Sequence, residues 1–83
     1  MTEKSEVAKI AAELMETVLQ KMSLSGELLT EENEEEVQIL VRGSGLGLLI
    51  GKHGRTLEAL QFILSIVANK NAEIKKRVSL DIE

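Results

Sequence analysis

Hydrophobic residues near the start of the chain recur every three or four positions, and polar residues fill the gaps. Over residues 7–22 this pattern predicts an amphipathic helix of about five turns, with Glu, Lys and Gln on its outer side. Thr2 or Ser5 is the expected N-cap, since a Ser or Thr hydroxyl can accept a hydrogen bond from a first-turn amide. The serine-rich stretch 23–26 then ends the helix.

The middle and the end of the chain follow a two-residue period, which is typical of strands with one buried face. Apolar and polar residues alternate over 36–42 and again over 77–82, so both segments are predicted strands. Residues 27–31 are a weaker strand candidate. Residues 32–34 form the expected turn of an antiparallel hairpin between the first two strands.

Two further helices are predicted between the second and third strands. Residues 46–50 suffice for one or two turns, and residues 55–69 form a long helix. The main apolar stripe of this long helix consists of Leu57, Leu60, Ile63, Leu64, Val67 and Ala68. Phe62 and Ile66 widen the stripe, so the long helix is expected to be buried on more than one side, with Phe62 in the core.

The order helix, strand, strand, helix, helix, strand constrains the architecture. A hairpin makes the first two strands antiparallel, whereas a helical crossover makes strands 36–42 and 77–82 parallel if they are neighbours. The three-stranded sheet is therefore mixed, and the helices can pack on one of its faces. We predict an α+β domain of two layers, since 83 residues are too few for two cores.

Four residues between the two later helices form the clearest candidate site. In this glycine loop (residues 51–54), Gly51 and Gly54 bracket Lys52 and His53. Glycine lets a backbone approach a phosphate closely, because it has no Cβ and tolerates positive φ angles. The helix that starts at Arg55 adds free amides and a dipole that attract anions. We therefore expect a phosphate site; a plain helix–helix turn, the alternative, accounts poorly for the bracketed Lys-His pair.

Charge is distributed unevenly along the chain. The formal net charge is −4, yet residues 1–36 carry ten Glu and three Lys, whereas residues 37–83 carry seven Lys or Arg and four Glu or Asp. The glycine loop lies in the basic part, with Arg42 just ahead of it. Because binding depends on the local field more than on the total charge, the acidic total does not exclude a nucleic-acid ligand.

The other charged clusters are expected to be surface features. Lys70, Lys75, Lys76 and Arg77 fit an exposed connection between helix and strand better than a set of specific contacts. The acidic run 31–36 lacks the Asp-x-Asp spacing and the glycine of a calcium loop, so we expect a solvated hairpin tip.

Several classes of function are excluded by what the chain lacks. Without cysteine there is no disulfide, thiolate metal site or cysteine nucleophile, and His53 is the only histidine. Leu46 and His53 stand where a Walker A loop needs Gly and Ser or Thr, and the dinucleotide fingerprint fails where Leu48 or Ile50 replaces Gly. No nucleophile and base are paired, so we expect no enzyme activity, no cofactor and no metal. No apolar run or signal peptide suggests membrane insertion, so a cytoplasmic protein is expected.

The glycine loop and its flanks resemble a known family. Residues 47–57, Gly-Leu-Leu-Ile-Gly-Lys-His-Gly-Arg-Thr-Leu, look like the Ile-Gly-x-x-Gly signature of KH domains, and the order of elements resembles the type II, bacterial version. With 45–62 and 77–83 included, the chain is similar to the KH domain of the Jag (SpoIIIJ-associated) family. Proteins of that family commonly carry more, including a second basic domain for single-stranded nucleic acid. Residues 1–83 are therefore expected to be a single KH domain, either a stand-alone protein or one excised from a longer multidomain protein.

The resemblance implies a ligand and a set of contacts. KH loops clamp about four unpaired nucleotides, so it implies a bacterial module that binds single-stranded RNA, with single-stranded DNA left open. The loop amides would hold phosphates, the loop cations would add charge, and His53 would add a hydrogen bond or, at lower pH, a second charge. Gly47 and the side chains of Leu48 or Leu49 and Ile50 would line an apolar wall, while a neighbouring strand would offer backbone groups to base edges. The implied RNA-binding residues are Gly47, Leu49, Ile50, Gly51, Lys52, His53, Gly54, Arg55 and Thr56.

A protein-interaction module is the alternative function. The first helix, or the exposed face of the sheet with Leu29 and Leu40, could form a homodimer or dock another KH protein. This alternative is compatible with RNA binding, because KH domains often act in pairs.

Overall fold

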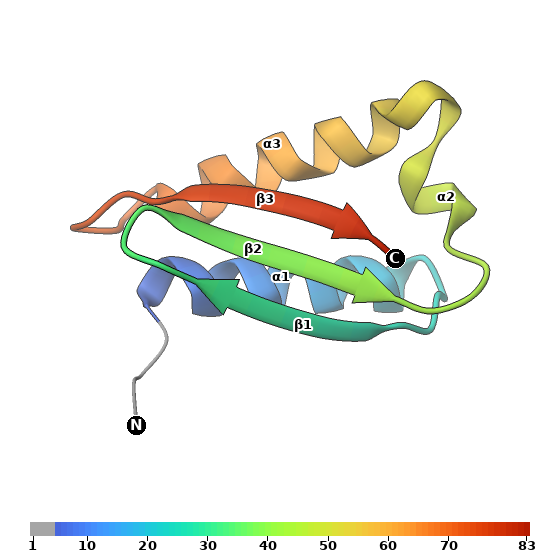
Figure 1. The fold of residues 1–83 in the computed structure, drawn as a ribbon, viewed down its shortest axis with the longest axis horizontal. Coiled ribbons are helices and arrows are strands. Elements are labelled where there is room, and N and C mark those ends of the chain that lie inside the picture. The colour runs from blue at the N-terminus through green and yellow to red at the C-terminus, as the bar shows by residue number, and fades with distance from the viewer. Residues whose placement is uncertain (1–4) are drawn as a thin grey trace.

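A three-stranded sheet forms one layer of the structure and helices form the other (Figure 1). The computed structural model describes residues 5–83. Its elements are α1 (Glu6–Lys21), β1 (Glu27–Glu32), β2 (Glu36–Arg42), α2 (Gly47–Ile50), the 3-10 turn η1 (Lys52–Gly54), α3 (Arg55–Asn69) and β3 (Arg77–Ile82). Both the order and the α+β class agree with the prediction, and the arrangement is that of a type II KH fold.

The central strand of the sheet is β2, which pairs with both other strands. It is antiparallel to β1, with Ile39 opposite Thr30, and parallel to β3, with Ile39 beside Leu80. Asn33 shapes the hairpin turn, because its Oδ1 accepts hydrogen bonds from the amides of Glu35 and Glu36 at 2.8 Å each. The predicted mixed sheet is confirmed.

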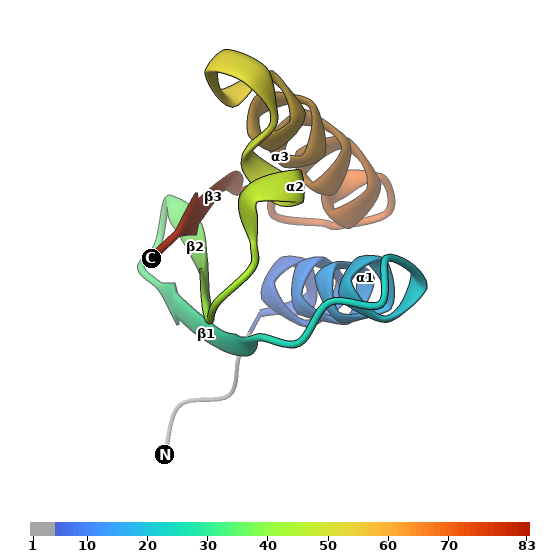
Figure 2. The same cartoon turned by 90° about the vertical axis from the view of Figure 1, so that its right-hand side faces the viewer.

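The core lies between one face of the sheet and the helices, as the end-on view shows (Figure 2). Val37, Ile39 and Val41 of β2 all point into it, as the two-residue period predicts. α1 starts at the predicted cap Ser5, whose Oγ accepts a hydrogen bond from Ala8 N at 3.1 Å, whereas Thr2 lies outside the described residues. The buried core residues are Val7, Ala8, Ala11, Met15, Leu19, Val37, Ile39, Val41, Leu46, Leu49, Leu64, Ala68, Val78 and Leu80.

The prediction that α3 is buried on more than one side was wrong. Only Leu64 and Ala68 of this helix are fully buried, and Phe62, expected in the core, is 66% exposed. The reason is geometric, because α3 lies at one side of the helical layer, where α1 and β3 pack against a single face of it (Figure 2). The opposite face, with Ile63 and Ile66, is exposed.

An ion pair joins the end of β1 to the connection before β3. Lys76 Nζ lies 2.7 Å from Glu32 Oε2, and the two side chains are only 12% and 18% exposed. Ser5 also donates to Glu32, through its amide at 2.8 Å and its hydroxyl at 2.7 Å. Two expectations are corrected here. Glu32 and Glu36 are not part of a solvated tip, since both are half-buried and accept hydrogen bonds, and Lys76 is not an exposed cation; Glu31, Glu34 and Glu35 are exposed as predicted.

The bonds around Glu32 make this carboxylate a source of stability. The hydrogen bond from Lys76 is the main cause that lowers the pKa of Glu32 from 4.5 to about 2; partial burial opposes it, and the bonds from Ser5 lower it further. A lowered pKa means that the folded state favours the ionised form. The stabilisation is therefore complete above pH 4.5 and is lost as the pH falls towards 2.

Glu32→Gln tests this contribution. We expect the free energy of unfolding to fall by roughly 1–2 kcal/mol at pH 7. The effect is no larger because solvent still reaches part of the Glu32–Lys76 pair and screens its charges. The difference from the wild type should shrink as the pH falls from 4.5 to 2 in urea unfolding experiments. Glu31→Gln, on the same strand but exposed, is the matched control and should change stability by less than about 0.5 kcal/mol. Equal stability of Glu32→Gln and the wild type at pH 7 would contradict this account.

Candidate nucleic-acid interface

The glycine loop reverses the chain between α2 and α3 through positive φ angles. Gly51 has φ 71° and ψ −172°, a conformation that is essentially restricted to glycine. His53 and Gly54 follow in the left-handed region, with φ 57° and 73°. Histidine tolerates that region better than most residues, so His53 can stand where a β-branched residue would be strained.

Gly51 is required by a close contact as well as by its backbone angles. A Cβ at this position would lie 2.7 Å from Thr56 Cβ and 3.1 Å from Thr56 N, and nearer still to Thr56 Oγ1. Thr56 is partly buried in the first turn of α3. Its contact with Gly51 therefore sets the direction in which the chain enters α3, and this explains the first glycine of the motif by packing.

Gly54 has a different role, because it faces open space. A Cβ there would meet no atom within 4 Å. Gly54 is the N-cap residue of α3, and no side chain caps this helix. The successive left-handed and helical conformations of Gly54 and Arg55 form the kind of concave turn whose amides can surround an anion, at the positive end of the helix dipole.

Three potentially cationic side chains surround this turn. Lys52, His53 and Arg55 are exposed, and none of them takes part in the two ion pairs of the described residues. Arg42, which the sequence places just ahead of the loop, is instead bonded to Glu83 at 3.1 Å. The charge available at the loop therefore comes from the motif and the start of α3.

The apolar wall expected beside the loop is formed by fewer residues than the sequence suggested. Leu48 and Ile50 are exposed by 66% and 39%, and Gly47 lies on the same surface turn. Leu49 is fully buried, so its side chain belongs to the core and is not presented to a ligand. Within α2, Leu49 therefore packs in the core, whereas Leu48 and Ile50 remain exposed and can contact a ligand.

Sequence reasoning overlooked one residue near the loop. Gln61 lies on α3 one turn after Leu57, and its Oε1 accepts a hydrogen bond from Leu80 N of β3 at 2.9 Å. The available signal was a polar residue within the apolar stripe between Leu60 and Leu64. β3 is therefore the strand that faces α3, which the sequence alone did not identify.

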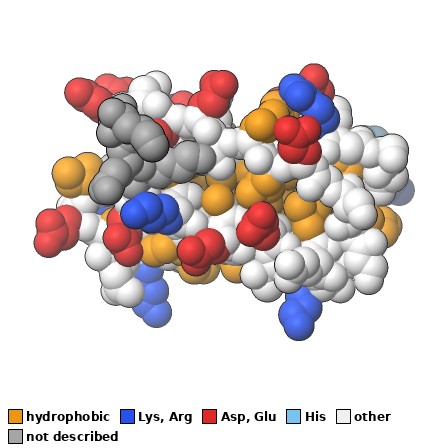
Figure 3. Space-filling model, turned by 90° about the horizontal axis from the view of Figure 1, so that it is seen from below, with side chains coloured by type: hydrophobic (Ala, Val, Ile, Leu, Met, Phe, Trp, Pro, Cys, Tyr) orange, Lys and Arg blue, Asp and Glu red, His pale blue; other side chains and the backbone are white. Residues whose placement is uncertain are grey.

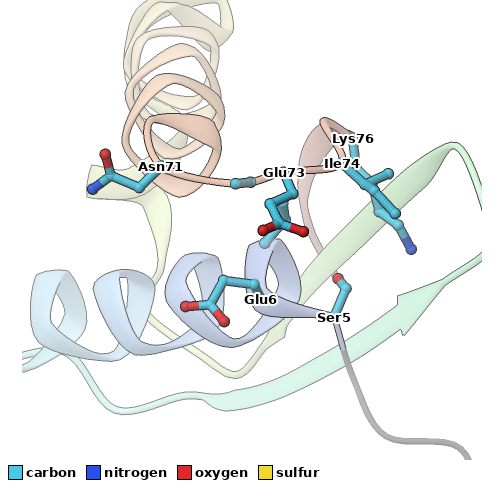
Figure 4. Close-up of a pocket in the computed structure, with 8 residues that line it drawn as sticks. Ser5, Glu6, Asn71, Glu73, Ile74 and Lys76 are labelled. Carbon is cyan, nitrogen blue, oxygen red and sulfur yellow. The ribbon is translucent and has the colours of Figure 1, made fainter.

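The surface away from the loop suits a nucleic acid poorly. Figure 3 shows the underside of the molecule as drawn in Figure 1, where acidic side chains, with basic ones among them, border a band of hydrophobic ones. A cavity of about 630 Å³ lies where the start of α1 meets the α3–β3 connection. Glu6 and Glu73 line this cavity, as Figure 4 shows, and their carboxylates would repel phosphate.

Metal and membrane sites are not indicated by the described part of the chain. Within residues 5–83, no three His, Cys, Asp or Glu side chains converge as possible metal ligands. None of the helices in this range combines the length and the apolar character that a membrane crossing requires.

Comparison with known proteins identifies the family. The sequence matches the family described as KhpA/KhpB, KH domain, over residues 5–82. The chain belongs to this bacterial KH-domain family. It is 39% identical over 75 residues to the RNA-binding protein KhpB of Clostridium symbiosum and 26% identical over 83 residues to the RNA-binding protein KhpB of Bacillus subtilis (strain 168).

The match covers most of this chain but a minor part of each relative. The aligned regions span 88% and 100% of the chain, but only 34% and 40% of the two KhpB proteins. The KH family is not an enzyme family, in agreement with the expectation from the sequence. The family match and the order of the elements together confirm the resemblance to a type II KH domain.

The two glycines of the loop should respond differently to substitution. Gly51→Ala is expected to cost at least about 2 kcal/mol of unfolding free energy, since strain and the clash with Thr56 add together. Gly54→Ala should cost about 1–2 kcal/mol, from its left-handed conformation alone. Gly47→Ala, in open space without a positive φ, is the control and should leave stability unchanged or slightly higher. Thermal and urea unfolding would measure all three, and a Gly51→Ala protein as stable as Gly47→Ala would refute the packing role of Gly51.

Proposed function

We propose that this domain binds single-stranded RNA and holds the phosphate backbone of about four nucleotides at the glycine loop. The observation that carries the proposal is the open left-handed turn at the uncapped start of α3, where Gly54 leaves space for a ligand. The names of the two relatives, both RNA-binding proteins, support the choice of RNA. We also propose that residues 1–83 are one KH domain that acts in the bacterial cytoplasm.

The residues of the site have different proposed roles. The amides of residues 51–54 and of the first turn of α3 hold phosphate oxygens. Lys52 and Arg55 add positive charge, and His53 adds a hydrogen-bond donor. Leu48 and Ile50 supply apolar surface for the bases. Thr56 acts indirectly, because its contact with Gly51 sets the direction in which the chain enters α3.

Reversal of charge in the loop tests this proposal. Labelled short RNA should bind the wild type with a roughly micromolar dissociation constant and a shallow salt dependence, because few phosphates are neutralised. Lys52→Asp combined with His53→Asp should weaken binding at least about tenfold, since two carboxylates would face the phosphates. Lys9→Asp combined with Lys21→Asp makes a similar reversal on exposed positions of α1 and should have a much smaller effect. The proposal fails if the amide spectra of residues 47–58 do not change when RNA is added to the wild type.

A second candidate function, self-association, is favoured by the exposed face of α3. Phe62, Ile63, Ile66 and Val67 are exposed by 66%, 50%, 53% and 43% and lie on one side of the helix. Contiguous apolar surface of this kind usually marks an interface with a partner. We propose this α3 face as the site of homodimer formation or of docking to another KH domain, in place of α1 or the open face of the sheet.

Sedimentation measurements would test self-association through the α3 face. The wild type is expected to shift towards a dimer as its concentration rises, because pairing removes the apolar side chains from water. Ile66→Asp should shift this equilibrium towards the monomer, since it places a charge within the interface. Ile74→Asp changes an equally apolar residue, 74% exposed and outside α3, and should not affect association. A wild type that stays monomeric at every concentration would count against the homodimer.

A further inference from the structure

The amides of the first residue of β3 and of the residue that follows this strand show how the edge strand is oriented. Arg77 N donates to Glu35 O and Glu83 N donates to Val41 O, each at 2.9 Å, so both amides face β2. Successive strand amides point in opposite directions. The intervening amides of alternate residues must therefore point to the free edge of the sheet.

Two of these free-edge amides are occupied by side chains. The amides that point outward belong to Val78, Leu80 and Ile82. Asp81 Oδ1 accepts a hydrogen bond from Ile82 N at 2.9 Å, and Gln61 Oε1 accepts one from Leu80 N at 2.9 Å. The edge of β3 therefore does not offer its Leu80 amide to a base, and a side chain of α3 stands in front of it.

The hydrogen bond from Leu80 fixes the orientation of the Gln61 amide. Only the oxygen of a carboxamide can accept from an N–H, so Nε2 must point away from Leu80 N. Within residues 5–83, Nε2 donates no hydrogen bond, and no buried side-chain nitrogen or oxygen lacks a partner. Nε2 must therefore be reached by solvent, with two donors free and one lone pair of Oε1 still available.

Gln61 is close enough to the glycine loop to contact a base of an RNA segment that is bound there. It lies six positions after Arg55, which is about 9 Å along the helix axis. α3 and β3 run side by side in opposite directions, with the start of α3 beside the later part of β3 (Figure 1). A base that extends from the loop between α3 and β3 would meet Gln61 before it could reach β3.

We propose that Gln61 reads a base of the bound RNA and that it favours adenine. A glutamine amide pairs with adenine through two hydrogen bonds, in which Nε2 donates to a ring nitrogen and Oε1 accepts from the exocyclic amino group. Leu80 holds the amide in place, so less freedom is lost on binding. This inference rests on the proposed RNA-binding function and adds the class of base that the site prefers.

Binding of two RNAs to the full chain tests the inference. The probes are an octamer of uridine and the same octamer with two central adenines, measured by fluorescence anisotropy. The wild type should bind the adenine-containing RNA about fivefold or more tightly, and Gln61→Leu should reduce this ratio to about one. Gln61→Glu keeps an acceptor for Leu80 N but loses both donors, so the ratio should fall here too. Gln20→Glu makes the same change at an exposed position of α1 and should keep the wild-type ratio.

The outcomes separate this inference from the proposed function. Partial unfolding of a variant lowers both affinities and leaves their ratio unchanged, so the ratio reports on base reading alone. If the wild type shows no preference for adenine, or if both Gln61 variants keep it, the inference is wrong while RNA binding stands. Tighter binding of both RNAs by Gln61→Leu would instead show that Gln61 blocks the access of RNA to β3, and would also overturn the inference. If the wild type binds neither RNA, the proposed function itself fails.

Discussion

The burial of one face of β2 is the constraint on which the rest of the structure depends. Val37, Ile39 and Val41 are almost completely excluded from solvent, and the same strand pairs with β1 on one side and β3 on the other. A shift of one residue in its register would turn these side chains to the open face of the sheet. The helices pack on the apolar face that this register creates, so the positions of α2, the glycine loop and α3 follow from it.

The glycine loop combines two requirements in four residues. Gly51 belongs to the scaffold, because its packing on Thr56 leaves no room for a Cβ and directs the chain into α3. Gly54 belongs to the surface, because the space around it is empty and its amide lies at the start of the helix. In this chain the two glycines of the motif therefore differ: Gly51 is required by the fold, whereas Gly54 leaves open space at the start of α3, and the exposed side chains of Lys52 and His53 lie between them.

Most of the fold could be predicted because its signals are local. The periods of α1, β2 and β3, the cap at Ser5 and the glycine loop all appear in the sequence as short patterns, and all were found at the predicted places. The prediction failed for Phe62 and for Glu32. A wide apolar stripe can serve a core or a partner surface, and a glutamate at a hairpin can be solvated or paired. These pairs of outcomes have the same sequence pattern.

By itself, the sequence determined the elements, their order, the glycine loop and the family to which the chain belongs. The tertiary structure decided which surfaces face one another: that Lys76 meets Glu32, that Leu49 is core while Leu48 is exposed, and that Gln61 covers the Leu80 amide of β3. The physical reason is the separation along the chain over which each kind of interaction acts. Periodicity and capping act over a few residues, whereas these contacts join residues 19 or 44 positions apart and exist only once the layers have packed.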